Sequence, residues 1–242
     1  MKWALTLGSS GDIGAQVARD LAAEGWSLYL HYNTNQQRIT TLSKELSTKY
    51  PKQDFLPLRA NLLSEKAVNK ITKNLFGLDA VIFAQGTTYY DLLIDFPSSK
   101  INEIFQMQLI TPINLLQQIQ PKLAQSKNGR IVFISSVYGQ TGSAMEVPYS
   151  AVKGAINTFV RAYSQEVASL GITVNAIAPG AVLTQMNAKM FSAETLSQLK
   201  DEIPVGNLAS PAEISYWVKV LVDEKARYMT GQTLYVTGGW LF

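Results

Sequence analysis

Three side chains in the second half of the chain could carry out acid–base chemistry together: Ser136, Tyr149 and Lys153. Tyr149 and Lys153 are four residues apart in a stretch with helical periodicity, so we expect them to share one helix face. A phenol with an ordinary pKa of about 10 is a weak acid–base catalyst at neutral pH. An ammonium one turn away would lower that pKa, and Ser136, at the end of an apolar run, would add a hydroxyl group. This set is suited to moving a proton to or from a substrate oxygen.

A glycine-rich turn follows the first apolar run and leads directly into a helical pattern. It contains Gly8, Ser10, Ile13 and Gly14 within the stretch Gly8-Ser9-Ser10-Gly11-Asp12-Ile13-Gly14. Small residues let the backbone approach a pyrophosphate, whose charge then lies at the helix N-terminus. Asp12 is unfavourable beside a pyrophosphate, so we expect its side chain to turn away and cap the helix. The turn predicts a nucleotide site.

Apolar runs alternate with helical patterns along the whole chain, which predicts a parallel, doubly wound Rossmann-type α/β sheet of about seven strands with helices on both faces. The expected strands are Trp3–Leu7, Leu28–Tyr32, Phe55–Leu58, Ala80–Ala84, Arg130–Ser135, Thr173–Ala178 and Thr233–Val236. The expected helices are Ile13–Ala23, Gln37–Thr48, Glu65–Phe76, Ile101–Gln118, Ala151–Ser169 and Pro211–Val222. No repeat or linker divides the chain, so we expect a single domain over residues 1–242.

Helix ends and one long loop support this division. Gly25 and Gly171 stand where left-handed residues end helices, and Ser210-Pro211 with Glu213 is typical of a helix start. Pro112 should kink the fourth helix. The long segment Ala181–Leu208, with a helical piece near Glu194–Lys200, predicts a substrate loop.

The end of the second strand indicates which nucleotide binds. An acid there would accept hydrogen bonds from a ribose 2′-hydroxyl and repel a 2′-phosphate, but the strand ends in Tyr32 and Asn33 without one. NADP(H) is therefore favoured over NAD(H), although Arg38 lies far along the next helix. We expect His31 to pack at the strand end or face the phosphate.

Composition excludes several other classes of function. The net charge of +3 comes with no basic run, which argues against nucleic-acid binding. With no cysteine and one histidine, the chain has no thiolate metal site, no cysteine nucleophile and no set of histidines for a metal. No apolar run is long enough to span a membrane and no signal peptide is visible, so we expect a cytoplasmic protein without a membrane or metal role.

Taken together, the glycine-rich turn, the Ser136, Tyr149 and Lys153 spacing and the stretch Asn175–Gly180 resemble the short-chain dehydrogenase/reductase family. The resemblance extends from Leu5 to Gly239. It implies hydride transfer, in which Tyr149 gives a proton to the carbonyl oxygen and Ser136 hydrogen-bonds that oxygen. Lys153 would tune Tyr149 and hold the nicotinamide ribose. Further implied cofactor contacts are Asn61, Leu62, Ala84, Gly86, Pro179, Gly180, Val182 and Thr184.

The chain departs from the family pattern at several positions. Leu7 and Asp12 stand where threonine and glycine are usual, and Phe83-Ala84-Gln85-Gly86 replaces Asn-Asn-Ala-Gly. Gln108 stands where the family has an asparagine that helps the proton relay. Glutamine offers the same donor and acceptor on a longer arm, so we expect Gln108 to serve the relay.

The resemblance leaves the substrate open. Within the family the overall likeness is to the 3-oxoacyl-acyl-carrier-protein reductases, and Lys127 and Arg130 would supply basic residues to dock the acidic carrier. A second similar subgroup is the elongation factor P 5-aminopentanone reductases, which would act on a ketone of a modified lysine. Small aliphatic or aromatic ketones are a third option, and a redox sensor that binds the nucleotide without catalysis is a fourth.

Two further expectations concern apolar surface. Met186, Met190, Phe191 and Leu196 of the substrate loop would form an apolar pocket wall. The resemblance also implies a homodimer or homotetramer, formed through the helices that bear Gln108 and Tyr149 and through the tail Trp240-Leu241-Phe242.

Overall fold

The computed structural model describes residues 2–190 and 193–240. Its centre is one parallel sheet with the strand order β3-β2-β1-β4-β5-β6-β7, as the alternation of apolar runs and helices predicted. The strands are β1 (Lys2–Leu7), β2 (Trp26–Tyr32), β3 (Phe55–Arg59), β4 (Ala80–Phe83), β5 (Arg130–Ile134), β6 (Thr173–Pro179) and β7 (Thr233–Val236). The order reverses between β1 and β4, which is where ligands bind in open sheets of this kind.

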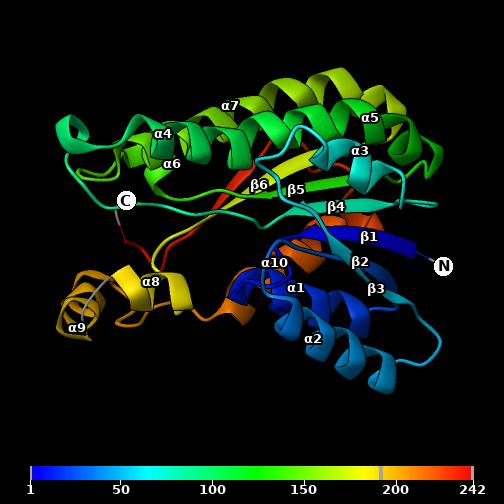
Figure 1. Cartoon of the computed structure of the whole chain (residues 1–242), viewed down its shortest axis with the longest axis horizontal. Helices are drawn as coiled ribbons and strands as arrows, with labels where there is room; N and C mark the ends of the chain where they lie inside the picture. Colours follow the sequence, from blue (N-terminus) through cyan, green and yellow to red (C-terminus); the bar gives the residue numbers. More distant parts are fainter. Residues whose placement is uncertain (1, 191–192, 241–242) are drawn as a thin grey trace.

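Helices cover both faces of the sheet (Figure 1). On one face lie α3 (Ala67–Thr72), α4 (Ser98–Phe105), α5 (Thr111–Gln125) and α7 (Val147–Val167), and on the other lie α1 (Asp12–Ala23), α2 (Gln36–Lys49) and α10 (Pro211–Val222). Shorter elements are α6 (Tyr138–Thr141), α8 (Gln185–Met190), α9 (Ala193–Glu202), η1 (Leu93–Asp95), η2 (Gln106–Ile110), η3 (Ala168–Leu170) and η4 (Glu224–Ala226).

Side-chain alternation along the strands builds two separate cores. Leu5 and Leu7 of β1 pack with the α5 and α7 face, whereas Ala4, the residue before Leu5, packs with the α1 and α10 face. Phe83 and Phe133 stack on neighbouring strands with ring centroids 4.4 Å apart. Both faces of the sheet are therefore covered by helices, and the carboxyl ends of the strands are left as the edge at which a ligand can bind.

Several helix boundaries follow the sequence signals. Gly25 and Gly171 have φ values of +86° and +75°, in the left-handed region that favours glycine. Ser210 caps α10 and forms a reciprocal capping box with Glu213.

The fourth predicted helix contains a π-helical turn. The elements α4, η2 and α5 follow one another without a break in the helical backbone, and Pro112 lies two residues after η2. Proline has no N–H group for the helical hydrogen-bond pattern, and the pattern changes from α to π just before it. The predicted helix Glu65–Phe76 is shorter, Ala67–Thr72, and α7 starts earlier than predicted, at Val147.

Candidate active site

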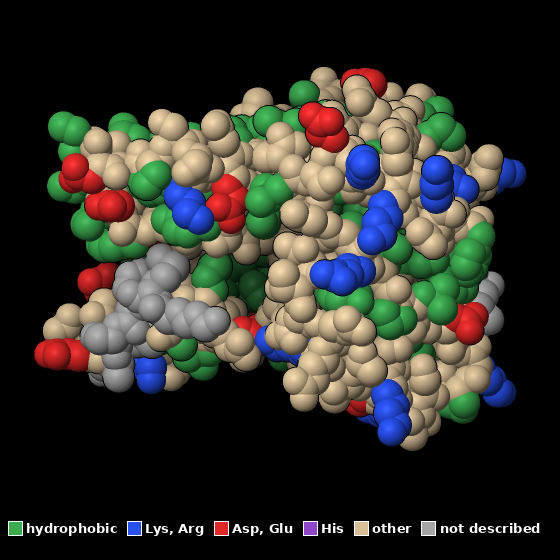
Figure 2. Space-filling model, viewed as in Figure 1, with side chains coloured by type: hydrophobic (Ala, Val, Ile, Leu, Met, Phe, Trp, Pro, Cys, Tyr) green, Lys and Arg blue, Asp and Glu red, His purple; other side chains and the backbone are tan. Residues whose placement is uncertain are grey.

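A cavity of about 460 Å³ opens at the carboxyl edge of the sheet. Figure 2 shows this side of the molecule hollowed between the lobe that carries α8 and α9 and the main body. Its walls come from the segments that follow β1, β4, β5 and β6, together with α8, α9 and Trp240. Segments far apart in the sequence therefore meet at the edge where parallel sheets bind ligands.

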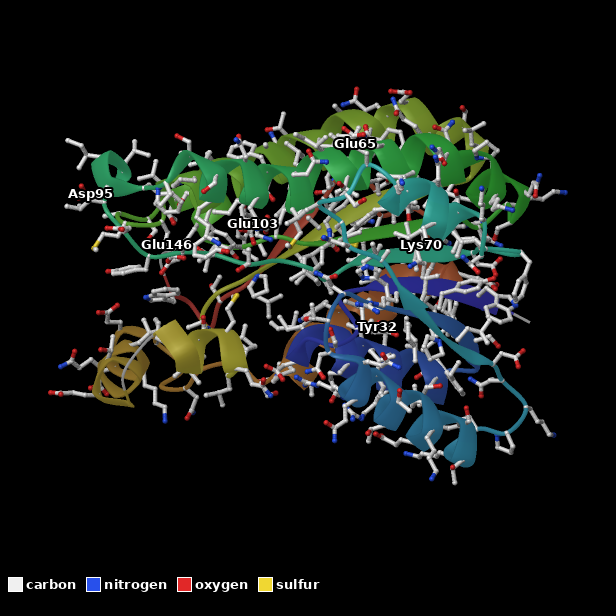
Figure 3. All side chains as sticks on the ribbon, in the orientation of Figure 1. Tyr32, Glu65, Lys70, Asp95, Glu103 and Glu146 are labelled. Atoms are coloured by element: carbon white, nitrogen blue, oxygen red, sulfur yellow. The ribbon has the colours of Figure 1, made fainter. Side chains whose placement is uncertain are left out.

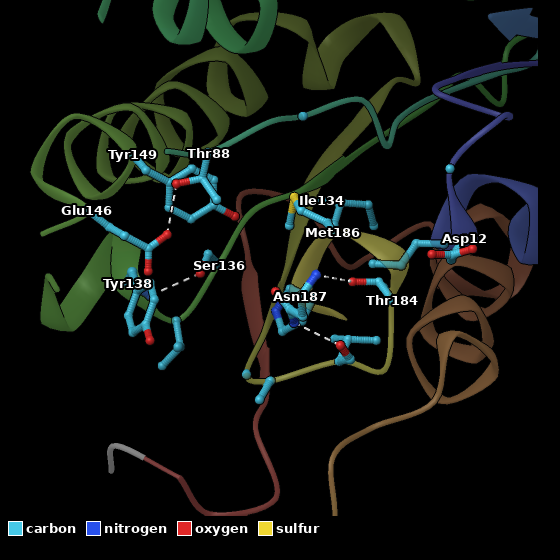
Figure 4. A pocket seen from close by; sticks show the side chains of 18 of the residues that line it. Asp12, Thr88, Ile134, Ser136, Tyr138, Glu146, Tyr149, Thr184, Met186 and Asn187 are labelled. Atoms are coloured by element: carbon cyan, nitrogen blue, oxygen red, sulfur yellow. Dashed lines mark hydrogen bonds between the residues drawn. The ribbon is translucent and has the colours of Figure 1, made fainter. Parts of the chain in front are cut away.

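Ser136, Tyr149 and Lys153 all line this cavity. Ser136 follows β5 and its hydroxyl oxygen accepts a hydrogen bond from the backbone N–H of Tyr138 at 3.2 Å. Tyr149 and Lys153 lie one turn apart on α7, and the Lys153 ammonium lies 5.3 Å from the centre of the Tyr149 ring. The hydroxyl, the phenol and the ammonium predicted from spacing thus meet in one place (Figure 4 labels the first two).

The electrostatics of Tyr149 differ from the sequence prediction. Burial and the nearby charge of Glu146 raise the pKa of Tyr149, while its hydrogen bond with Ser136 acts in the opposite direction. Lys153 donates to the carbonyl oxygen of Ile134 at 2.8 Å, and burial lowers its pKa to about 7. The net effect is upward and Lys153 is not among the groups that shift the pKa of Tyr149, contrary to the expectation that Lys153 lowers it. Tyr149 is therefore held as a protonated phenol.

Two glycines of the nucleotide turn are required by close packing. A Cβ atom on Gly14 would lie 2.3 Å from the carbonyl oxygen of Gly8, and one on Gly8 would lie 2.7 Å from the backbone nitrogen of Gln85. Gly8 also has a φ of +76°. Gly8 therefore packs against the segment that follows β4, and Gly14 packs against Gly8. The members of the turn that line the cavity are Ser10, Gly11, Asp12 and Ile13.

The single histidine of the chain, His31, accepts a hydrogen bond from this turn. The Nδ1 atom of His31 accepts the backbone N–H of Gly8 at 3.2 Å, and Nε2 lies 3.1 Å from the carbonyl oxygen of Ala60. His31 is buried, and burial lowers its pKa to about 4. It is thus a neutral packing residue at the end of β2 that fixes the nucleotide turn.

Asp12 does not cap α1, contrary to the sequence prediction. Gly11 is the N-cap residue, and the Asp12 carboxylate instead pairs with the guanidinium of Arg38 at 2.6 Å. Its other oxygen accepts the backbone N–H of Gln185 at 2.6 Å, at the start of α8. Arg38 also lines the cavity, as does Asn35. The expectation that Arg38 lies too far away is therefore wrong, because the N-terminal turn of α2 brings it over Asp12.

The predicted cofactor residues divide into two groups. Those that line the cavity are Ser10, Asp12, Ile13, Ala84, Gly86, Tyr149, Lys153, Pro179, Gly180, Val182 and Thr184. Those outside its lining are Gly8, Gly14, Tyr32, Asn33, Asn61 and Leu62. Tyr32 is buried in the core under α1 and α2, and Figure 3 shows it on that side of the molecule. The contacts of the second group with a nucleotide stay predictions.

Gln108 lies behind the cavity and not in its lining. It sits in the π-helical turn η2, is buried, and donates through Nε2 to the carbonyl oxygen of Thr87 at 2.7 Å. Its Oε1 atom has no hydrogen-bond partner among the described residues, and neither has Oε1 of the nearby buried Gln85. Burying an oxygen acceptor without a donor costs free energy, and a water molecule that donates to it would remove that cost. A water molecule at this position is also what a proton relay through Gln108 requires. The relay role of Gln108 stays a prediction.

Glu146 is a cavity residue that the sequence analysis did not single out. It is buried, precedes the first residue of α7, and accepts a hydrogen bond from the Thr88 hydroxyl at 2.8 Å. Burial raises its pKa. The neighbouring Tyr138 has its pKa raised to about 12, first by burial and then by the Glu146 charge. Its position three residues before Tyr149 is the sequence signal that could have drawn attention to it.

The substrate loop contributes one wall of the cavity. Met186, Asn187 and Leu199 line it, and Trp240 packs on Tyr138 with ring centroids 5.8 Å apart. Met186 thus lies where the sequence predicted an apolar wall. Phe191 and the side chains of Met190 and Leu196 lie outside the described part of the chain, as do Leu241 and Phe242 of the tail.

The predicted docking residues Lys127 and Arg130 do not lie at the cavity. Arg130 begins β5, at the opposite end of that strand from Ser136, and is buried. Its guanidinium donates to the carbonyl oxygens of Gly129 and Asp223. The prediction of an exposed basic patch containing Arg130 is therefore wrong. The reason is that η4 and the end of α10 cover the amino end of β5, which the local sequence does not reveal.

Comparison with known proteins identifies the family. The sequence profile described as enoyl-(acyl carrier protein) reductase matches residues 8–241. An uncharacterized oxidoreductase of Bacillus subtilis, YmfI, is 40% identical over 99% of this chain and 98% of the relative. The 3-oxoacyl-[acyl-carrier-protein] reductase FabG of Aquifex aeolicus is 32% identical over 98% of this chain and 96% of the relative. The chain belongs to the short-chain dehydrogenase/reductase family.

Solved structures of other reductases share the fold. YwfH, an NADPH-dependent reductase involved in bacilysin biosynthesis, superposes with a TM-score of 0.91 at 22% identity, over 98% of this chain and 97% of its own. A 3-oxoacyl (acyl-carrier-protein) reductase from Agrobacterium tumefaciens C58, solved with NADP bound, gives a TM-score of 0.91 at 23% identity, over 99% and 94% of the two chains.

As a short-chain dehydrogenase/reductase, the chain is an oxidoreductase that acts on a CH–OH or C=O group. Among the residues that the structure describes, no helix is long and apolar enough to cross a membrane. Within the same residues, no cluster of metal-ligating side chains occurs.

Proposed function

We propose that this protein is an NADP(H)-dependent carbonyl reductase with Tyr149 as its proton donor. The observation that carries the proposal is the convergence of Ser136, Tyr149 and Lys153 in one cavity, beside the glycine-rich turn at the start of α1. A phenol and a serine hydroxyl that are hydrogen-bonded to each other can both turn toward the oxygen of a single carbonyl.

The residues of the cavity suit a nicotinamide dinucleotide. The turn between β1 and α1 brings small residues to the N-terminus of α1, where unpaired N–H groups favour a pyrophosphate. Pro179 and Gly180 line the cavity at the end of β6, and Lys153 lies beside Tyr149 where it could hold a ribose. When bound, the reduced nicotinamide supplies a hydride to the carbonyl carbon.

Each cavity side chain then has a defined task. Tyr149 gives its hydroxyl proton to the carbonyl oxygen, so that the ketone becomes a secondary alcohol and a phenolate remains. Ser136 donates a hydrogen bond to the same oxygen as its negative charge develops. Lys153 stabilises the phenolate and lies on the route by which a proton returns to Tyr149, with Gln108 behind it as the expected end of the relay.

Arg38 supports a preference for NADP(H) over NAD(H). It lines the cavity beside Asn35 at the start of α2, and β2 ends without an acid that would repel a 2′-phosphate. Guanidinium groups bind phosphates through paired hydrogen bonds. The 2′-phosphate would compete with the Asp12 carboxylate for the Arg38 guanidinium, so Asp12 lowers the affinity for NADP(H).

Two substrate classes follow from the relatives and the structure. The first is a 3-oxoacyl thioester, which the names of the FabG relatives support. The second is a ketone on a modified lysine, as in the elongation factor P 5-aminopentanone reductases. Burial of Arg130 favours the second, because it removes a cation that would dock an acyl-carrier protein.

We also propose a cytoplasmic homodimer or homotetramer. The exposed Ile110 at the end of η2 and the exposed Val147 at the start of α7 support packing through these helices. Such apolar residues on neighbouring helices are typical of faces that pack against a second copy.

The test is a titration of the purified protein with NADPH and with NADH, followed by nicotinamide fluorescence. A 3-oxoacyl thioester is then added, and the absorbance of the reduced cofactor is followed. We expect tighter binding of NADPH and its consumption by a ketone. Tight binding without consumption of any ketone would instead indicate a sensor, and binding of neither cofactor would contradict the proposal.

A further inference from the structure

Glu146 places a buried carboxylate in the substrate part of the cavity. It occupies the N-cap position of α7, but its side chain makes no capping hydrogen bond with the helix. Instead the carboxylate lies beside Thr88 and Tyr138 (Figure 4). Figure 3 shows Glu146 above the α8 and α9 lobe, at the opposite end of the molecule from the α2 face. The carboxylate is thus directed at the space beside the reacting groups and not at its own helix.

The backbone before Glu146 is shaped to hold it there. Met145 has a φ of +63°, in the left-handed region that side chains other than glycine rarely adopt. Its carbonyl oxygen accepts the backbone N–H of Asp91 at 2.9 Å, which ties the turn to the segment after β4. Such strain persists where surrounding contacts impose it, and it occurs often at functional sites.

Glu146 has no cationic partner in the described part of the chain. None of the ion pairs among the described residues includes it, and the Thr88 hydroxyl is a neutral donor. Burying a carboxylate without a counter-charge costs free energy, and this is why burial raises the pKa of Glu146. A cation that entered the cavity would remove that cost.

The other charges of the cavity do not serve this purpose. Arg38 is paired with Asp12 at the nucleotide end, and Lys153 donates to the carbonyl oxygen of Ile134. The remaining charged residue in the lining is Glu202, a second carboxylate, which is exposed at the rim. The substrate end of the cavity is therefore acidic.

Aromatic rings accompany the carboxylate. Tyr90, Tyr138 and Tyr149 line the same cavity, and the faces of such rings attract alkylammonium groups. A carboxylate among tyrosine rings combines charge attraction with an apolar surface for the carbon chain. This arrangement disfavours a substrate whose distal group is anionic.

We propose that Glu146 is a specificity residue that binds a positively charged group on the ketone substrate, so that the preferred substrate is an alkylammonium ketone. The proposal rests on the proposed carbonyl reductase function and names the substrate class of the same site. The ketone lies at Ser136 and Tyr149 while its cationic group pairs with Glu146. A cationic side chain of a modified protein and a small amino ketone share this chemistry.

The experiment compares three ketones of matched length with NADPH. They are 6-(trimethylammonio)hexan-2-one, its neutral isostere 7,7-dimethyloctan-2-one, and the anionic 6-oxoheptanoate. The quaternary ammonium keeps its charge and cannot condense with the ketone of its own chain. We expect kcat/KM for the cation to exceed that for the neutral isostere by about tenfold to a hundredfold, mainly through KM, with the anion poorest.

The variant Glu146→Gln should remove this preference, so that kcat/KM for the cation falls to that for the neutral isostere. Glu146→Asp should keep part of the preference, because it keeps the charge on a shorter arm. Glu65→Gln is the matched control, since it removes an exposed carboxylate outside the cavity lining and should leave the preference unchanged. Loss of all three activities in equal measure in Glu146→Gln would overturn the proposal and indicate a structural role.

Calorimetric titration of the NADPH complex with the same three ketones separates this inference from the reductase proposal. A preference for the cation that disappears in Glu146→Gln supports the cation site even if no ketone is reduced. Equal binding of the cationic and neutral ketones overturns it even if both are reduced. A stronger response to the neutral ketone or the anion would mean that Glu146 is a protonated hydrogen-bond donor, which also overturns it.

Discussion

The carboxylate of Asp12 joins the nucleotide turn to two other segments of the chain, because it pairs with Arg38 at 2.6 Å and accepts the N–H of Gln185 at 2.6 Å. Arg38 comes from α2 and Gln185 begins α8, so one side chain links the nucleotide end of the cavity to its substrate wall. Any ligand that draws Arg38 away from Asp12 acts on this junction.

Replacement of Arg38 should change cofactor preference. Arg38→Ala should weaken NADPH binding by about tenfold or more and leave NADH binding within about twofold, since only NADPH carries the 2′-phosphate. Asp12→Asn should strengthen NADPH binding, because it frees the guanidinium. Fluorescence titration of both nucleotides measures these changes. Arg19→Ala, which breaks the exposed pair of Arg19 with Glu45, is the control. Equal weakening of NADPH and NADH by Arg38→Ala would show that Arg38 does not contact the phosphate.

Removal of the Tyr149 hydroxyl should abolish reduction. Tyr149→Phe deletes the proton donor and keeps the ring, so we expect kcat to fall by about a thousandfold or more while the Kd for NADPH stays within about twofold. Tyr163→Phe removes another buried tyrosine hydroxyl of α7, bonded to Gln120, and should leave turnover unchanged. An unaltered rate in Tyr149→Phe would reject Tyr149 as the acid.

The charge of Glu146 should also appear in the pH dependence of alcohol oxidation. Oxidation needs the phenolate of Tyr149, and the pKa of that phenol is raised first by burial and then by the carboxylate of Glu146. Glu146→Gln removes the negative charge, so the pKa of Tyr149 falls and the rising limb of kcat/KM moves to lower pH. A profile of oxidation of a neutral secondary alcohol with NADP⁺ measures the shift. Glu65→Gln, which removes an exposed carboxylate outside the cavity lining, is the control. An unmoved limb in Glu146→Gln would show that the two groups are uncoupled.

The sequence predicted those features that depend on local spacing. Tyr149 and Lys153 lie one helical turn apart and Ser136 ends a strand, so a parallel sheet was enough to bring them together. The alternation of apolar runs and helical patterns likewise predicted the sheet and its two helical layers.

Features that depend on contacts between distant segments were missed. Arg38 reaches the nucleotide end because α2 packs beside the turn after β1, and Arg130 is buried because η4 covers the start of β5. Glu146 looks like an ordinary helix start, and its direction is visible only with Thr88 and Met145 in place. Such packing has no periodic signature in the sequence.

The neutral state of His31 should make stability depend on pH. Burial lowers the pKa of His31 from its ordinary value to about 4, against a smaller opposite effect of its contact with the carbonyl oxygen of Ala60. Between about pH 6.5 and pH 4 the unfolded chain binds a proton that the folded chain does not, so the free energy of unfolding falls as the pH is lowered. The loss approaches about 3 kcal/mol by pH 4, and stability from this group is fully present above pH 6.5.

His31→Asn isolates this effect. The asparagine amide oxygen can accept the Gly8 N–H without a group that titrates, and the chain has no other histidine. Urea unfolding at a series of pH values should show a steeper fall below pH 6.5 in the original protein than in the variant. Because carboxylates titrate in both proteins, the difference between the two curves belongs to His31. Parallel curves would mean that His31 is protonated equally in the folded and unfolded states. A neutral His31 would then not be needed to hold the nucleotide turn.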